Sequence, residues 1–366
     1  MKVQFPDYSH SLVSLSNSIL KYYNAGATHE TLPELDAALT DNPKRVILML
    51  FDGLGTAQLE RHLPESSFLR RHLVSPISSV FPPTTVAATA SVISALNPIE
   101  HGRLGWWLYF HEVDDNVSAF GNILQKTNQP AAEYRMTDRY MPMVPVWEKI
   151  RTAAPDVKAA YVSPFGEYKT RSTAHACRTI QKLTQGEEDC FVYCYRPFPD
   201  TNIHAFGNGG PIPDINIKII DREVRRLCSQ LKDSLVIVTA DHGLTDVEYL
   251  HYRDYPELED MLLRKPSMEG RAASIFLKEG TQERFRETFN QLLGKDFLLL
   301  SKEEVYACGL LGSGEPHPRT DGFLGDYLAL ATGNKFLTAL EGKTLKAHHA
   351  GLTDEEMNVP LILCRT

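Results

Sequence analysis

The sequence predicts an α/β fold in which a mostly parallel central sheet lies between helices on both faces. Three observations favour it: short apolar segments, helical patterns between them, and polar or glycine-containing turns where the apolar segments end. Continuous apolar runs are typical of strands buried on both faces, as in parallel sheets. Ligands of such sheets bind beyond the carboxyl ends of the strands, so residues at those ends are the first candidates for a functional site.

The predicted strands are short apolar runs, namely RVILMLFDG at 45–53, residues 157–164, residues 190–195, SLVIVTADHG at 234–243, and PLILC at 360–364. Helical spacing of apolar residues falls between them, at 9–24, 56–72, 85–96 and 215–231.

The stretch 246–335 has a different pattern, because a charged helical segment is surrounded by short apolar pieces and loops with glycine and proline. We therefore expect an α/β core formed by residues 1–245 and 336–366, with 246–335 inserted as a cap or subdomain.

The composition of the chain indicates which kinds of molecule it can bind. The net charge of -8 argues against an extended nucleic-acid surface, which needs clustered lysine and arginine. A small phosphorylated substrate stays compatible, because bound metal ions supply local positive charge. The opening MKVQFPDYSH has no export signal, no apolar run is long enough for a membrane helix, and the six cysteines form no CxxC pair. We expect a cytoplasmic protein with free thiols and no membrane association.

Asp52 and a threonine pair are the first two candidates for chemistry. Asp52 directly follows the first predicted strand, where it either caps the turn or binds a metal, and Gly53 allows the sharp exit. In FPPTT, Thr84 and Thr85 open the helix at 85–96. A hydroxyl there is ordinarily an N-cap, but the same helix end favours an alkoxide and a bound phosphate.

Histidine and aspartate pairs supply the remaining candidates. Asp200 and His204 are four residues apart in PDTNIHAFG, so one helical turn brings both to one face. Asp241 and His242 directly follow the clearest strand. His349 stands beside His348 in a late loop, and either ring is a candidate, with a surface histidine pair as the alternative.

Taken together, these segments offer three aspartates, three histidines and a hydroxyl, several of them at strand ends that meet at one edge of the sheet. This combination predicts a site for two metal ions ~3.5–4 Å apart, of the kind that clamps an in-line displacement at phosphorus.

The ordered motifs of the chain resemble those of the alkaline phosphatase superfamily, and most closely its nucleotide pyrophosphatase/phosphodiesterase branch. The matching motifs are DG after the first strand, FPxxT, NPxxHG, PDxxxH, ADHG and HxGLxxEEMxVPL, which together span residues 45–363. The resemblance implies a mostly parallel sheet between helices.

The resemblance also implies the roles of the candidates. Thr85 is the expected nucleophile, with Thr84 as the alternative, and the reaction is expected to pass through a covalent phospho-threonine. One cation is expected among Asp52, Thr85, Asp241 and His242, and the other among Asp200, His204 and His349. The resemblance and the Asp/His donors favour zinc, while manganese or iron suit similar sites.

The substrate side departs from the family pattern. The branch usually offers an asparagine after the nucleophile helix to hold a phosphate oxygen, but RLGWWLYF at 103–110 has none, so Arg103 or backbone N–H groups are expected to substitute. Tyr195, Trp106 and Trp107 are candidates to stack on a base or aryl group, with core packing as the alternative.

The expected function is therefore hydrolysis of phosphoric esters, as a phosphodiesterase or nucleotide pyrophosphatase acting on a small substrate such as a nucleotide. The alternatives are a phosphomonoesterase of the same superfamily and a metal-stabilised binding protein without turnover. A phosphoglycerate mutase-like isomerase and a sulfatase fit less well, because they would be expected to use serine or a modified cysteine at the position of Thr85.

Overall fold

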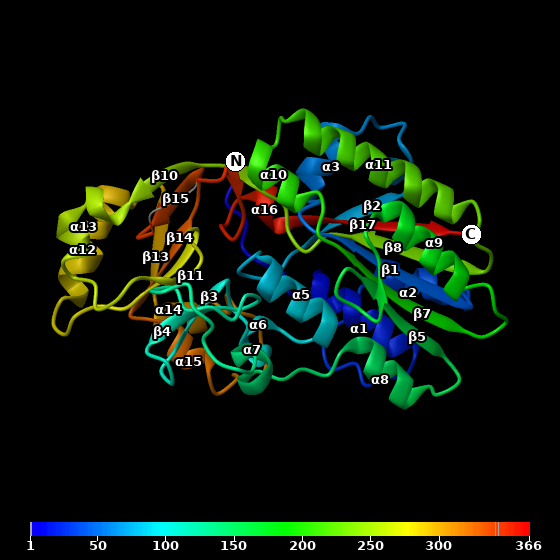
Figure 1. Ribbon diagram of the computed structural model, residues 1–366, viewed down its shortest axis with the longest axis horizontal. Coiled ribbons are helices and arrows are strands. Elements are labelled where there is room, and N and C mark those ends of the chain that lie inside the picture. Colours follow the sequence, from blue (N-terminus) through cyan, green and yellow to red (C-terminus); the bar gives the residue numbers. More distant parts are fainter. Residues whose placement is uncertain (1, 341, 343) are drawn as a thin grey trace.

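The computed structural model describes residues 2–340, 342 and 344–366. Its largest element is a seven-stranded sheet flanked by helices on both faces, which confirms the predicted fold class (Figure 1). In spatial order its strands are β2 (Leu73–Ser78), β17 (Asn358–Arg365), β8 (Ser234–Thr239), β1 (Arg45–Phe51), β7 (Cys190–Arg196), β5 (Lys158–Ser163) and β6 (Tyr168–Lys169).

The centre of this sheet is parallel. Strand β1 pairs in parallel with β7 and β8, and β5 pairs in parallel with β7 and β6, whereas β17 runs antiparallel to both β8 and β2. Every residue of β1 and β8 is buried, as their apolar sequences predict. Phe51 lies opposite Arg196 and Leu50 opposite Thr239, so the three central strands end at one edge.

Two helix layers cover the sheet (Figure 1). One layer contains α1 (Leu12–Tyr22), α2 (Pro33–Leu39), α5 (Thr85–Ser94) and α8 (Val146–Ala153). The other contains α3 (Thr56–His62), α4 (Phe68–Arg71), α9 (Thr173–Leu183), α10 (Asp200–Phe206) and α11 (Pro211–Cys228). The single helix expected at 56–72 is two helices, because Leu63 precedes Pro64 and adopts an extended conformation that ends α3.

A second unit lies at the left of the core in Figure 1. Its six-stranded antiparallel sheet has the order β13 (Phe297–Ser301), β14 (Tyr327–Ala331), β12 (Ala272–Ile275), β11 (Ser267–Met268), β3 (Trp107–Phe110) and β4 (Asp115–Ser118). Its helices are α12 (Pro256–Glu259), α13 (Gln282–Leu293), α14 (Lys302–Ala307) and α15 (Thr320–Phe323). Strands β3 and β4 come from 107–118, so the second sheet includes residues outside the expected insertion. The division of the chain at 246–335 stays a prediction.

The remaining elements are short. They are the pair β10 (Glu248–His251) and β15 (Lys335–Thr338), the pair β9 (Thr245–Asp246) and β16 (Ala347–His348), α6 (Pro98–His101), α7 (Met136–Tyr140), the 3₁₀ turn η1 (Tyr252–Asp254) and α16 (Asp354–Met357). Within the described ranges, none of the helices combines the length and hydropathy needed to cross a membrane.

Candidate active site

The three candidate aspartates lie together at the carboxyl edge of the central sheet. Asp52 follows β1, Asp241 lies just beyond β8, and Asp200 begins α10 after β7. The backbone N–H of Asp200 donates to the carbonyl of Asp52 at 2.9 Å. The N–H of Gly53 donates to Oδ1 of Asp241 at 3.0 Å. The in-register parallel strands therefore bring together three carboxylates that are far apart in the sequence.

Thr85 is the first residue of α5 and its hydroxyl faces this cluster. Its Oγ1 lies 3.2 Å from Nε2 of His242 and 3.5 Å from Oδ1 of Asp52. Thr84 is the N-cap, yet its side chain does not cap the helix, because its hydroxyl donates to Oε1 of Glu269 at 2.7 Å. Of the two threonines, Thr85 therefore presents its oxygen to the carboxylates and imidazoles.

His242 lies at the centre of the first expected ligand group. Its Nε2 is 3.5 Å from Oδ1 of Asp52 and 3.5 Å from Oδ2 of Asp241. Its Nδ1 lies 3.0 Å from the carbonyl of Gly243, which can only accept, so Nδ1 carries the proton and Nε2 keeps its lone pair. Asp52, Asp200 and His242 also form one of the two described groups whose ligand atoms lie within 4.8 Å of one another.

The second expected ligand group is the other such cluster, formed by Asp200, His204 and His349. Nε2 of His204 lies 3.1 Å from Oδ1 of Asp200, one turn earlier in α10. Nδ1 of His204 faces the carbonyl of Ala347 at 2.7 Å, which again leaves Nε2 for a ligand bond. His348 is engaged elsewhere, since its Nε2 lies 2.7 Å from the hydroxyl of Tyr249.

The donor atoms of the site fit divalent cations. Oδ2 of Asp241 and Nδ1 of His349 are buried without a hydrogen bond, although buried polar atoms are normally satisfied. Burial raises the pKa of Asp241 to about 7, with a further contribution from the charge of Asp200. Burial, with the neighbouring charges of Asp241 and Asp200, raises the pKa of Asp52 well above its usual range. Cations bound among these oxygens and imidazole nitrogens would pair with the unsatisfied atoms and balance the charge of the buried carboxylates.

Tyr195 contacts the cluster through Asp52 and does not face the cavity. Its hydroxyl donates to Oδ2 of Asp52 at 2.5 Å, and it is not one of the described residues that line the adjoining cavity. Its position therefore suits holding the Asp52 carboxylate, whereas Trp106 and Trp107, the other two aromatic candidates, do line the cavity.

A cavity of about 420 Å³ opens beside Thr85. Asp200, His204 and His349 line it on the core side, and segment 265–270 of the second unit lines it opposite, together with Trp106 and Trp107. The cavity thus lies between the two units, with the candidate aspartate, histidine and threonine side chains on the core and much of the opposite wall on the second sheet.

Arg103 does not stand in for the missing asparagine. Its guanidinium donates to the carbonyl of Met141 at 2.8 Å and to Asp138 at 3.1 Å, and it is not among the described cavity-lining residues. The lining residues that the sequence analysis did not single out include Glu269 and Ser267. No motif marks either of them, because their approach to Thr85 depends on how the second sheet packs on the core.

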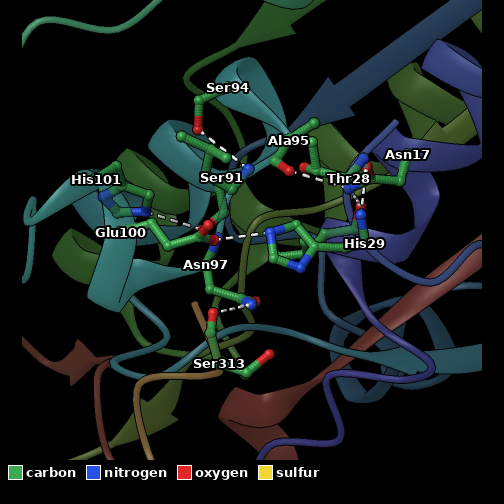
Figure 2. A network of polar contacts seen from close by, with 12 residues as sticks. Asn17, Thr28, His29, Ser91, Ser94, Ala95, Asn97, Glu100, His101 and Ser313 are labelled. Atoms are coloured by element: carbon green, nitrogen blue, oxygen red, sulfur yellow. Dashed lines mark hydrogen bonds and ion pairs between the residues drawn. The ribbon is translucent and has the colours of Figure 1, made fainter. Parts of the chain in front are cut away.

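A buried polar network holds the far end of α5 (Figure 2). The amide of Asn17 on α1 donates to the carbonyl of Ala95 at the end of α5, and its oxygen accepts from the N–H of Thr28 and His29. His29 pairs with Glu100 of α6 at 2.7 Å. The network fixes α5 against α1 and α6, which keeps Thr85 in place at the opposite end.

Comparisons with known proteins bear on the family and on the fold. The family model of type I phosphodiesterases / nucleotide pyrophosphatases matches residues 46–296. The structure is similar to murine ectonucleotide pyrophosphatase/phosphodiesterase 5, with a TM-score of 0.64 and 16% identity over 88% of both chains. The structure of an inactive variant of that murine protein in complex with AMP has a TM-score of 0.63 and 16% identity, over 86% of this chain and 87% of the other.

A bacterial structure is equally similar. Phosphonoacetate hydrolase from Sinorhizobium meliloti 1021, in complex with phosphonoformate, gives a TM-score of 0.63 and 16% identity over 88% of this chain and 90% of the other. At these identities, the structural similarity establishes the fold. A search of the curated proteins finds no match.

Proposed function

Because the chain belongs to the type I phosphodiesterase / nucleotide pyrophosphatase family, we propose that it hydrolyses phosphodiesters of small substrates, with Thr85 as nucleophile and two divalent cations in attendance. The family match supports phosphoester hydrolysis as the general activity. The observation that carries the finer proposal is the Thr85 hydroxyl, which faces His242 and Asp52 from the first turn of α5.

The residues proposed to hold the cations form two groups. Asp200, His204 and His349 would hold one, and Asp52, Thr85, Asp241 and His242 would hold the other. When bound, the cations supply Lewis acidity and positive charge at the reacting oxygens. Carboxylate and imidazole donors favour zinc, with manganese or iron as alternatives that metal analysis distinguishes.

Thr85 is proposed to attack phosphorus in line. A bond forms between its Oγ1 and phosphorus while the bond from phosphorus to the leaving alcohol breaks, which gives a covalent phospho-threonine. Water then attacks phosphorus and releases Thr85. Since the Thr84 side chain leaves the start of α5 uncapped, the N–H groups of that turn are available to a non-bridging phosphoryl oxygen.

A nucleotide is the proposed class of substrate. The murine structural neighbour was observed with AMP. Trp106 and Trp107 line the cavity beside Thr85 and offer aromatic faces on which a base can stack. A panel of nucleotide sugars, dinucleotides, aryl diesters and aryl monoesters tests both the substrate class and the phosphomonoesterase alternative.

The decisive variant is Thr85→Val, which keeps the shape of the side chain and removes its hydroxyl. We expect hydrolysis of bis(4-nitrophenyl) phosphate to fall by at least about a thousandfold, as loss of a nucleophile entails, while the proposed aspartate and histidine ligands still bind metal. Thr85→Ser is the matched variant that keeps a hydroxyl and should keep measurable turnover. Near-wild-type activity in Thr85→Val would reject the proposal, and stoichiometric metal without turnover on any ester would favour the binding-protein alternative.

A cytoplasmic location is also proposed. All six cysteines are free, and free thiols are usual in a reducing compartment. Fractionation of cells that express the tagged chain tests this, since recovery outside the cytoplasm would contradict it.

A further inference from the structure

Glu269 lies on the cavity wall that faces Thr85. It directly follows β11, which pairs with β12 and β3 inside the second sheet, and it lines the same cavity as Thr85. Its Oε1 accepts hydrogen bonds from the hydroxyl of Thr84 at 2.7 Å and from the backbone N–H of Trp106 at 2.8 Å. These two donors fix a carboxyl group beside the residue that precedes the nucleophile.

The second oxygen of Glu269 is left for the cavity. In the described ranges of the chain, no hydrogen bond reaches Oε2. Burial raises the pKa of Glu269 to about 7, and the hydrogen bonds from Thr84 and Trp106 act in the opposite direction. Above pH 7 the Glu269 carboxylate therefore contributes a negative charge to the cavity that Thr85 also lines.

Apart from the proposed metal ions, the described residues around the cavity supply no arginine to match a second phosphoryl charge. The carboxylates and amines on its lining are those of Asp200, Glu269 and Lys265, and its imidazoles are proposed metal ligands or are engaged elsewhere. Lys265 is exposed, four residues before Glu269 on the same segment. Arginine is the side chain best suited to clamp a phosphate dianion.

We propose that Glu269 is a specificity-determining residue that favours phosphodiesters over phosphomonoesters, an inference that rests on the proposed reaction at Thr85. The phosphoryl group of a diester carries a single negative charge, whereas that of a monoester carries close to two at neutral pH and above. The Glu269 carboxylate repels the second charge of a monoester. A diester has a neutral ester oxygen in place of that charge.

A purely structural role for Glu269, tying β11 to the start of α5, makes a different prediction. Glu269→Gln separates the two, because the amide oxygen can still accept from Thr84 and Trp106 while the charge is lost. A structural tie alone would leave the ratio of diester to monoester activity unchanged.

The test compares kcat/KM for bis(4-nitrophenyl) phosphate and 4-nitrophenyl phosphate at pH 9, where the wild-type carboxyl is ionised. We expect Glu269→Gln to lower the diester-to-monoester ratio by about tenfold, the order of a unit-charge repulsion across several ångströms at intermediate dielectric, chiefly by raising monoester turnover. Glu269→Asp should keep a ratio near that of the wild type. Glu259→Gln, which removes an exposed carboxylate of α12, is the charge-matched control and should leave the ratio unchanged.

A second variant covers the case in which Glu269→Gln fails to fold. Gln125→Lys adds a cation to the same cavity without touching the Glu269 contacts and should lower the ratio in the same direction. An unchanged ratio in the folded variants overturns the inference. Thr85→Val distinguishes failure of the inference from failure of the proposed function. If Thr85→Val abolishes both activities and Glu269→Gln leaves the diester-to-monoester ratio unchanged, only the inference fails. If Thr85→Val retains both activities, the proposed function fails.

Discussion

The buried pair of Arg271 and Glu356 allows the sharpest prediction about stability. Both side chains are fully buried, and the guanidinium donates to the two carboxylate oxygens at 2.7 Å each. Arg271 also donates to the carbonyls of Gly333 and Lys335, while Glu356 accepts from the N–H of Gly351. The pair thus joins the second sheet to the loop that carries His349, one of the proposed metal ligands.

Arg271→Met leaves the Glu356 carboxylate buried without its cation. Removal of one partner from a buried pair costs about 3–5 kcal/mol. At an unfolding entropy of about 2.1 cal/mol/K per residue, a loss of about 4 kcal/mol lowers the Tm of a 366-residue chain by about 5 °C. The loop that holds His349 should loosen as well, so metal affinity should fall.

Thermal unfolding by calorimetry and metal titration measure these two effects. Arg286→Met is the matched control, because Arg286 pairs with Glu304 at 2.6 Å on the surface, where a pair contributes less than about 1 kcal/mol. An equal loss of stability in the two variants, or a Tm of Arg271→Met within about 1 °C of wild type, would refute the reasoning about the buried charge.

Three further changes have defined outcomes. Asn17→Ala should cost about 2–3 kcal/mol in chemical denaturation, because it leaves several buried backbone groups near α5 without partners; a cost below about 0.5 kcal/mol contradicts the role of the network. Gly243→Ala should abolish activity or folding, since its Cβ would lie 2.0 Å from the carbonyl of Glu355; a crystal structure of an active variant would disprove this. Tyr195→Phe removes the hydrogen bond to Asp52 and should weaken metal binding by about tenfold or more in a chelator competition, as loss of a supporting hydrogen bond usually does; unchanged affinity would show that the bond is dispensable.

The sequence was most informative about the centre of the fold. Strands β1 and β8 have continuous apolar centres, and Asp52 and Asp241 follow within two residues of their ends, which identifies both the buried sheet and its carboxyl edge. Because parallel strands in register end together, the approach of Asp52 to Asp241 followed from the sequence alone. The same argument extended to Asp200, which begins α10 just beyond β7.

The second sheet and the substrate wall could not be predicted in the same way. Strands β3 and β4 join β11 through pairing between residues far apart in the chain, such as Met268 with Trp107, and nothing local in 107–118 indicates that partner. The position of Glu269 depends on this pairing, since its carboxyl reaches Thr84 only when β11 lies against the start of α5. Likewise, the sequence around Arg103 does not predict that its guanidinium donates to the carbonyl of Met141.

The covalent step at Thr85 can be tested most directly by rapid acid quench of the metal-loaded enzyme during turnover of bis(4-nitrophenyl) phosphate, followed by mass spectrometry of the peptide that contains residues 81–102. The account predicts a nitrophenyl phosphoryl group on Thr85 in the wild-type protein and none in Thr85→Val. An adduct on Thr84, or steady turnover by Thr85→Val without any adduct, would contradict it.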